Sequence, residues 1–268
     1  MKTLVEILKE QYVYRKQIWK LAVSDLVKTY SGAALGWAWA VISPAVTLFV
    51  YWFAFSVGMR GGRDVDGYPY FLWLTTGMVP WFYVRSMLTG GASSLRRYTY
   101  LITKIKYPIS TIPTFVNLSS FFVHLVLMAI VVLLYLAFGY MPDLYWLQLP
   151  FYMVLAFVFF NIWGLFSGIL SSFSRDFLNL VRSLTTALLW MSGILYSVNT
   201  INTDWIRFIM LLNPITVIIN GYRNCFIYKQ WFWETSNELL NYVLVTSVLC
   251  MLAVWAYDKL RKDIPDVL

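Results

Sequence analysis

The sequence predicts an all-α, polytopic membrane protein. We expect six transmembrane helices, an N-terminal amphipathic interfacial helix and a re-entrant helical hairpin before the last span. Two observations predict this fold class. Hydrophobic residues make up 60% of the 268 residues and charged residues only 13%, which is more apolar surface than a soluble chain of this length buries. Several apolar runs also reach the roughly 20 residues that a helix needs to cross a hydrocarbon core.

Residues 1–31 are predicted to form a cytoplasmic amphipathic helix, and residues 32–268 the membrane-embedded domain. Apolar residues between positions 18 and 26 recur at helical spacing, with lysines between them. This pattern is typical of a helix that lies at the membrane surface with its basic face toward lipid headgroups. A soluble helix packed on a partner is the alternative. The segment lacks a continuous apolar core and a small-residue cleavage site, so we expect no cleaved signal peptide.

Six apolar runs are expected to span the membrane. The first is the most continuous, with more than twenty residues free of charge, and the second is interrupted by Gly77 and Pro80. In the fourth, Gly164 and Gly168 have the small-xxx-small spacing that lets helices approach closely. The predicted spans are about residues 35–57, 70–91, 112–138, 147–170, 183–198 and 239–257.

Residues 205–228 are predicted to enter the membrane without crossing it. Asn213-Pro214 divides this segment into two apolar pieces of about eight residues, and eight helical residues cover only about 12 Å. Broken backbone at membrane depth must be shielded by protein or line a water-filled cavity. We therefore expect the hairpin to dip in from outside and line an opening.

The distribution of basic residues predicts the orientation. Fifteen of the 21 Lys and Arg residues lie on the proposed cytoplasmic segments, which is the positive-inside pattern rather than a nucleic-acid-binding stripe. Both termini are then cytoplasmic, the number of crossings is even, and the turn at residues 60–66 is outside. We expect a multi-pass protein that contacts membrane lipids and binds no nucleic acid.

No motif for catalysis or metal binding occurs in the sequence. It lacks a GxxxxGK[ST] phosphate loop, HExxH, GxSxG and any Cys/His cluster, so we predict no catalytic site, metal or cofactor on this chain. The two cysteines do not form a disulfide framework. His124, the only histidine, is either a functional group inside a span or a packed residue bonded to a neighbouring helix. Arg85 either extends to the interface or faces a wet lumen and pairs with a phosphate.

Aromatic residues are concentrated in the first two spans. Interfacial belts explain those at span ends but explain Tyr51 and Trp52 less well. Aromatic faces offer apolar area with polar handles, which suits a pathway for sugars; lipid-facing or helix-packing aromatics are the alternative. The predicted pathway residues are Trp37, Trp39, Tyr51, Trp52, Phe55, Phe82, Arg85, Trp190 and Tyr196.

Three stretches resemble the permease subunits of type-2 ABC exporters for lipid-linked polysaccharides. They are Asp25 followed by residues 30–39 and Pro44, the Ser174-Arg175-Asp176 turn, and residues 212–216 with Gly221-Tyr222-Arg223. Residues 51–67, above all their RGGRDVDG turn, together with Trp73, Gly77 and Trp81-Phe82, are similar to the wall teichoic acid export permeases in particular. The general features also fit O-antigen or capsule exporters. The sequence departs from the family near Tyr30, where the usual basic pair is reduced to Lys28.

This resemblance implies a homodimer with two copies of a separate ABC ATPase, which carries the ATP and Mg. Such a complex would export undecaprenyl-diphosphate-linked teichoic acid across the bacterial cytoplasmic membrane by alternating access. The resemblance also implies an outer gate of Asn213, Pro214, Tyr222 and Arg223. A coupling helix at about residues 98–106 would dock into the ATPase through Tyr98, Thr99, Tyr100, Leu101, Ile102, Lys104, Ile105 and Lys106.

Several alternatives stay open. From its residues alone, the segment around residues 98–106 is either a helix that presents one face to a partner or a basic loop that touches anionic lipid. An O-antigen, capsule or drug permease keeps the family and changes the cargo. An ATP-independent scramblase or channel would transport without an ATPase. A membrane-embedded transferase is disfavoured, because paired carboxylates and a His-Asp cluster are absent from the cytoplasmic loops.

Overall fold

The computed structural model describes residues 2–268 except 33, 61–63, 199–200 and 202. Within these residues the chain is helical, and its one β-type contact is the bridge between Val65 and Tyr68. The all-α prediction is therefore confirmed. The long helices are α3 (Trp39–Trp52), which continues as the π-helix η2 (Phe53–Arg60), α4 (Tyr70–Arg97), α6 (Thr111–Ala137), α7 (Leu149–Phe173), α8 (Arg175–Met191) and α11 (Ser236–Leu260).

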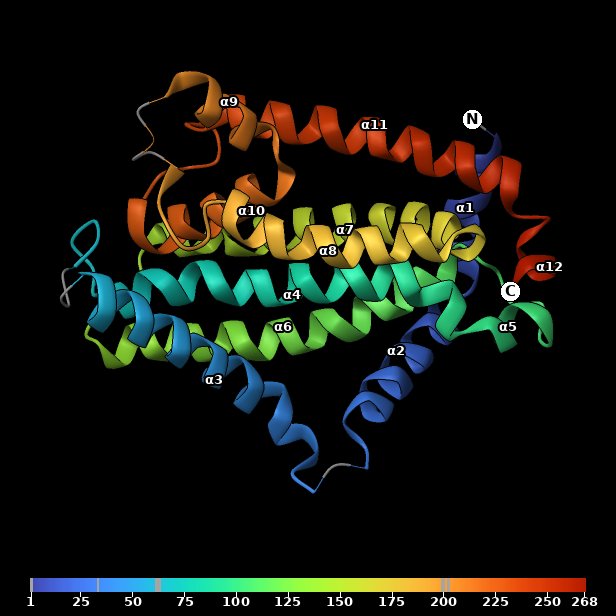
Figure 1. Ribbon diagram of the computed structural model, residues 1–268, viewed down its shortest axis with the longest axis horizontal. Coiled ribbons are helices and arrows are strands. Elements are labelled where there is room, and N and C mark those ends of the chain that lie inside the picture. The colour runs from blue at the N-terminus through green and yellow to red at the C-terminus, as the bar shows by residue number, and fades with distance from the viewer. Residues whose placement is uncertain (1, 33, 61–63, 199–200, 202) are drawn as a thin grey trace.

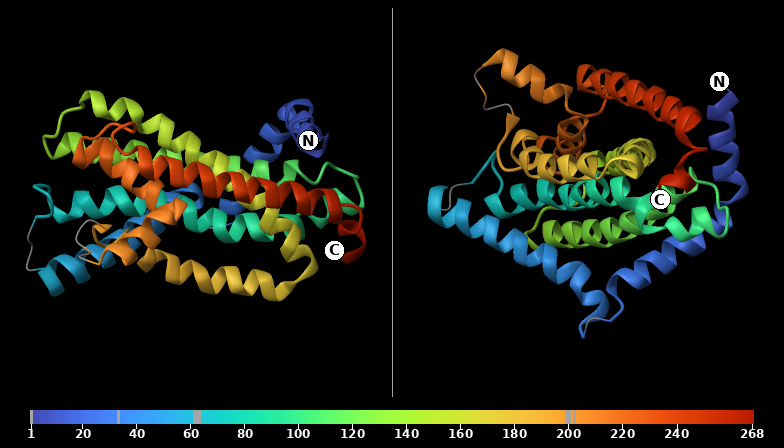
Figure 2. Two further views of the ribbon diagram at one scale, coloured as in Figure 1. Left: turned by 90° about the horizontal axis from the view of Figure 1, so that it is seen from above. Right: turned by 45° about the vertical axis from the view of Figure 1, so that its right-hand side comes forward.

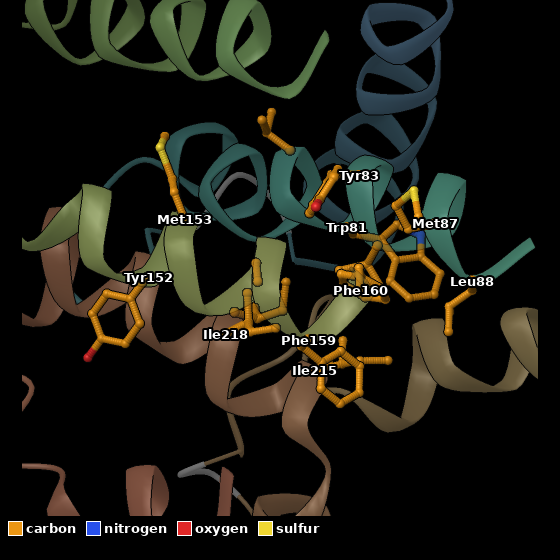
Figure 3. Packing of buried hydrophobic residues seen from close by; sticks show 14 of the residues in the cluster. Trp81, Tyr83, Met87, Leu88, Tyr152, Met153, Phe159, Phe160, Ile215 and Ile218 are labelled. Atoms are coloured by element: carbon orange, nitrogen blue, oxygen red, sulfur yellow. The ribbon is translucent and has the colours of Figure 1, made fainter. Parts of the chain in front are cut away.

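Helix α4 is the centre of the bundle. Of its 28 residues, 19 are buried, and α3, α6, α7, α8 and the short helix α10 (Pro214–Arg223) all pack against it. Figure 3 shows how Trp81 and Met87 of α4 lie beside Phe159 and Phe160 of α7. A Cβ atom on Gly91 would lie 3.0 Å from the Cα atom of Gly164, so these helices touch through their backbones, as the small-xxx-small spacing predicted.

Among the residues that the structure describes, four helical segments are long and apolar enough to cross a membrane, or five if the bent pair at residues 205–228 counts as one span. These four are Gly36–Gly58, Thr111–Ala137, Leu144–Phe173 and Ser236–Leu260. Helices α4 and α8 are not among them, although they run beside α6 and α7 (Figure 1). Both carry arginines and hydroxyl side chains, which lower their apolar character. Six crossings, and the orientation of the termini, stay predictions.

The N-terminal segment differs from the single helix expected over residues 1–31. It forms α1 (Lys2–Val13) and α2 (Arg15–Tyr30), because each half packs on a different partner. Glu6 of α1 pairs with Arg261 just after α11 at 2.5 Å, whereas α2 packs on α6. Together α2 and α3 form a V that diverges from the bundle (Figures 1 and 2).

Two predicted spans have different bounds in the structure. Helix α4 continues six residues past position 91, to Arg97, because Arg96 bonds the end of α7. Helix α8 occupies Arg175–Met191 rather than residues 183–198. It ends before Gly193, whose φ of +65° is left-handed and interrupts the helix.

The segment at residues 205–228 forms two helices as expected. Helix α9 (Asp204–Leu212) and helix α10, which continues as the π-helix η5 (Asn224–Tyr228), meet at Asn213 with a bend of 91°. Most of α10 is buried in the bundle, against α4 and α7. The remaining short elements are η1 (Gly36–Ala38), α5 (Thr99–Thr103), η3 (Leu144–Gln148) and α12 (Ile264–Val267).

Candidate functional site

A polar groove of about 530 Å³ lies between α3, α4 and α8. Helix α4 contributes Trp81, Arg85, Thr89 and Ser93, which are four residues apart and therefore share one face of the helix. Helix α8 also contributes residues from one of its faces, and Tyr51 lines the groove from α3. The complete lining is Tyr51, Trp81, Arg85, Thr89, Gly90, Ser93, Arg182, Thr185, Thr186 and Leu189.

The groove is basic. Two guanidinium groups, Arg85 and Arg182, line it together with hydroxyl groups, and no lining residue is acidic. The two arginines are exposed, and the ion pairs found among the described residues join other groups. Such donors bind phosphate oxygens and sugar hydroxyls rather than cations.

The predicted pathway residues separate into three groups. Tyr51 and Arg85 line the groove. Phe55 and Trp190 contact each other at one end of α3 and α8, with ring centroids 6.3 Å apart, and the hydroxyl of Tyr196 donates to the Trp190 carbonyl at 2.7 Å. The remaining four lie elsewhere: Trp37 stacks on Tyr30, Trp52 contacts Phe71, and Trp39 and Phe82 line a second cavity.

This second cavity, of about 550 Å³, lies inside the V between α2, α3, α4 and α6. His124 lines it, and its Nε2 atom is 2.8 Å from the hydroxyl of Tyr222 on α10. The imidazole also stacks on Tyr83, at 5.1 Å between centroids. His124 is thus bonded to a neighbouring helix, in the arrangement that the packing alternative described.

The four predicted gate residues join α10 to the rest of the bundle. Asn213 caps α10 by accepting from the Ile215 amide at 3.0 Å, and its amide donates to Ser192 at 2.8 Å. Pro214 is the first residue of α10, where its fixed φ favours a helix start. Tyr222 holds His124.

Arg223 is fully buried and bonds the backbone just after α8, a contact that we call the Arg223 clamp. Its guanidinium donates to the carbonyls of Gly193 and Ile194, both at 2.6 Å, and lies 3.7 Å from the centroid of the Trp73 ring. A Cβ atom on Gly77 would lie 2.6 Å from one of its nitrogens. Gly77 therefore provides the space in α4 that the buried guanidinium occupies.

The predicted coupling segment has a buried half and an exposed half. Helix α5 covers only Thr99–Thr103, shorter than residues 98–106. Lys106 has a left-handed φ of +55°, which is incompatible with a helix that continues to that residue. Tyr98, Leu101 and Ile102 are buried, and Thr99 and Thr103 are half-buried. The exposed residues are Tyr100, Lys104, Ile105 and Lys106. These four remain available to a partner.

Asp25 of α2 holds this segment in place. It accepts hydrogen bonds from Arg97 at 2.9 Å and from the Tyr98 hydroxyl. Burial, and then the hydrogen bond to the Asp25 carboxylate, raise the pKa of the Tyr98 phenol. The phenol therefore stays a proton donor at neutral pH.

Sequence reasoning missed most of the groove. Trp81, Thr89 and Ser93 on α4 and Arg182, Thr185 and Thr186 on α8 were not predicted as pathway residues. The signal that identifies them is helical spacing: positions 81, 85, 89 and 93 repeat every four residues, and the α8 positions fall on one face.

Comparison with known proteins identifies relatives that are similar to this chain in sequence. The chain is 28% identical over 264 residues to the O-antigen export system permease protein RfbA of Myxococcus xanthus, covering 97% of this chain and 98% of that protein. It is 25% identical to the RfbA protein of Klebsiella pneumoniae, covering 91% and 92%. It is 22% identical to the inner membrane transport permease YadH of Escherichia coli K12, covering 81% and 84%.

A profile of the ABC-2 type transporter family matches residues 16–227. That stretch contains all but the first residue of α2, the whole lining of the groove, the predicted coupling segment and Arg223. The predicted resemblance to type-2 ABC permeases is confirmed. The chain is a multi-pass membrane protein, and it belongs to the ABC-2 type transporter family.

Proposed function

We propose that this chain is the membrane-spanning subunit of an ATP-driven exporter that moves a lipid-linked polysaccharide outward by alternating access. The observation that supports this function best is the basic, hydroxyl-lined groove between α3, α4 and α8. The names of the relatives agree with it, since two of them are O-antigen export permeases.

The groove suits an anionic, hydroxyl-rich cargo. The guanidinium groups of Arg85 and Arg182 bind phosphate in a bidentate manner. The hydroxyls of Thr89 and Ser93 donate within α4 and accept from sugar hydroxyls. Tyr51 and Trp81 add aromatic area. Because these contacts recognise functional groups rather than one shape, successive units of a polymer can use them in turn.

A second copy of the chain completes the pathway. The groove is bordered by α3 and α8. Large apolar residues are exposed on α3, on its continuation η2 and on α8, among them Phe49, Phe53, Leu180 and Leu184. Lipid alone could cover the apolar rims, but charged groove residues such as Arg85 and Arg182 are costly to leave facing lipid, which favours a second protein over lipid at this surface. A homodimer that joins these rims would enclose the two grooves in one passage.

The energy source is a separate ATPase subunit that binds ATP and Mg. The sequence has no phosphate loop, and the exposed residues of the coupling segment offer a docking face for such a subunit. Helix α4 is continuous from that segment through the groove to Gly77 at the Arg223 clamp. A tilt imposed at its Arg97 end would therefore move both the groove and the clamp.

The cargo class has two candidates. An O-antigen-type polysaccharide is favoured, because the two RfbA relatives are aligned over more than nine-tenths of their length. Teichoic acid is the second candidate and rests on the turn at residues 60–67, of which 61–63 lie outside the described residues. Both polymers would be carried on a lipid through a phosphate linkage.

The test is purification of the chain with its native partners, followed by transport in proteoliposomes. We expect an ATPase with a phosphate loop to co-purify. We also expect ATP hydrolysis to rise with a lipid-linked O-polysaccharide more than with a lipid-linked teichoic acid. The reverse order would favour the second candidate, and stimulation by drugs alone would overturn polysaccharide export. Transport with no associated ATPase would identify a scramblase or channel instead.

A further inference from the structure

Another basic cavity, of about 410 Å³, lies where α4, α5 and α8 meet, apart from the groove and from the cavity beside His124. We call it the arginine pocket. It is at the end of the molecule where both chain termini lie (Figure 1). Its lining is Arg96, Thr99, Arg175, Leu178, Asn179, Arg182 and Leu268.

Helix geometry directs three polar side chains of α8 into this pocket. Arg175, Asn179 and Arg182 are separated by four and three residues and share one face of the helix. Arg182 also lines the groove, and it lies about 10 Å along the helix from Arg175. The arginine pocket and the groove therefore share one guanidinium.

The arginine pocket concentrates positively charged side chains. Three guanidiniums line it and no lining side chain is acidic. The ion pairs of the described residues involve Arg97, Lys229 and Arg261 instead.

Arg96 is held in position by backbone carbonyls. Its Nε atom donates to Ser171 at 2.5 Å and Nη2 to Ser172 at 2.9 Å. Its charge is thus fixed at one wall, while the exposed side chains of Arg175 and Arg182 make no hydrogen bond or ion pair within the described chain. Like charges gathered at one concave site are stabilised by a bound anion.

We propose that the arginine pocket binds a phosphate group between Arg175 and Arg182, with the Asn179 amide as a further donor. Planar guanidiniums match the oxygens of a phosphate in pairs, and several positive charges favour a diphosphate or phosphodiester over a single carboxylate. The phosphate belongs either to an anionic lipid headgroup or to the lipid carrier of the polymer. The inference rests on the proposed function only for the second source.

Because Arg182 lines both sites, a phosphate in the arginine pocket lies beside the opening of the groove. The pocket would then hold the charged end of a lipid before the attached polymer engages Arg85 and the hydroxyl face of α4.

The experiment is binding of geranyl diphosphate to the chain in complex with its ATPase. The complex is placed in phosphatidylcholine nanodiscs without nucleotide, and binding is followed by calorimetry, with geraniol as the uncharged comparison. Arg175→Gln is the diagnostic variant, because Arg175 lines the arginine pocket and not the groove. We expect Arg175→Gln to weaken binding about tenfold, the loss of one charge-assisted hydrogen-bond pair, and geraniol not to bind.

Lys262→Gln is the matched control, since Lys262 is exposed near the same end but lines neither cavity. It should bind the probe like the parent. Parent-like binding by Arg175→Gln would overturn the proposal, and so would an equal loss in Lys262→Gln or equal binding of geraniol. Arg175→Lys, which keeps the charge but loses the planar donor pair, should fall between the parent and Arg175→Gln.

A second arm separates the two sources. If the arginine pocket prefers a lipid headgroup, nanodiscs doped with phosphatidylglycerol abolish probe binding; if it prefers a carrier diphosphate, binding persists. Either result supports a phosphate site. A parent complex that exports polysaccharide but binds no probe overturns only this inference. One that binds the probe but exports no polysaccharide overturns only the proposed function.

Discussion

Asp25 of α2 forms an ion pair with Arg97 at the end of α4, at 2.9 Å. The carboxylate is almost fully buried, with 7% of the side chain exposed, while the arginine is 43% exposed. Tyr98 donates to the same carboxylate. One side chain thus joins α2, α4 and the start of the predicted coupling segment.

Replacing Asp25 with Ala is expected to loosen this junction. Hydrogen bonds to a charged group contribute about 1.5–3 kcal/mol each to stability. Because Arg97 is partly exposed to solvent, we expect its ion pair with Asp25 to contribute near the lower of these values. We expect a lower thermal unfolding midpoint in nanodiscs and a smaller rise of ATP hydrolysis with substrate. Asp266→Ala, which removes an exposed acid, is the control. Equal unfolding midpoints for the two variants would contradict the role of Asp25.

Arg223→Gln is expected to release the end of α8. It would leave the buried carbonyls of Gly193 and Ile194 without their donors, at a cost of about 1–3 kcal/mol each. Because Gly77 makes the space for this guanidinium, Gly77→Ala should destabilise through the same contact. The double variant should then cost less than the sum of the two single variants, measured from thermal unfolding.

Gly58→Ala provides the matched glycine control, because a Cβ atom there meets nothing within 4 Å. It should not lower the unfolding midpoint, since Ala favours a helix at least as well as Gly. Strict additivity of Gly77→Ala and Arg223→Gln would show that the two residues do not act on one contact.

Arg85→Gln and Arg182→Gln are expected to impair transport without unfolding the protein, because both side chains are exposed in the groove. Loss of one charge-assisted contact should weaken the apparent affinity for a lipid-linked polysaccharide about tenfold, read from substrate-stimulated ATP hydrolysis. Lys16→Gln, on the exposed face of α2, should behave as the parent. Unchanged affinity in both groove variants would remove the groove from the pathway.

The double variant Lys104→Glu and Lys106→Glu is expected to weaken coupling to the ATPase. Both lysines are exposed on the coupling segment, and reversing their charge opposes docking to a complementary surface. The measurement is substrate-stimulated ATP hydrolysis, together with the amount of ATPase that co-purifies. Lys262→Glu is the charge-matched control. Undiminished stimulation and export would show that this segment does not couple the subunits.

The sequence predicted the apolar helices well because their signal is local. The expected spans at residues 112–138 and 239–257 match α6 and α11 within three residues at each end. Helix α8 was placed too far along the chain, because its first turns carry Arg175, Asp176 and Arg182 and lack the apolar run used to find spans. These three side chains are exposed, and Arg175 and Arg182 line polar cavities rather than an apolar face of the helix.

The functional side chains were harder to predict because they depend on packing between helices. Tyr51 and Arg85 stood out by residue type, whereas Thr89 and Ser93 became informative only once α4 was known to be one continuous helix. Arg223 was expected at a gate, but nothing in the sequence indicated that Gly77, far away along the chain, would let it be buried on Trp73.

The most direct test of the account is ATP-dependent export in proteoliposomes that contain this chain and its co-purified ATPase. A lipid-linked polysaccharide is supplied on the side that carries the ATPase, and polymer on the opposite side is measured with a membrane-impermeant lectin. We predict export that requires ATP and that falls in the double variant Arg85→Gln and Arg182→Gln while basal ATP hydrolysis persists. Export of equal rate without ATP, or export unaffected in that variant, would contradict the account.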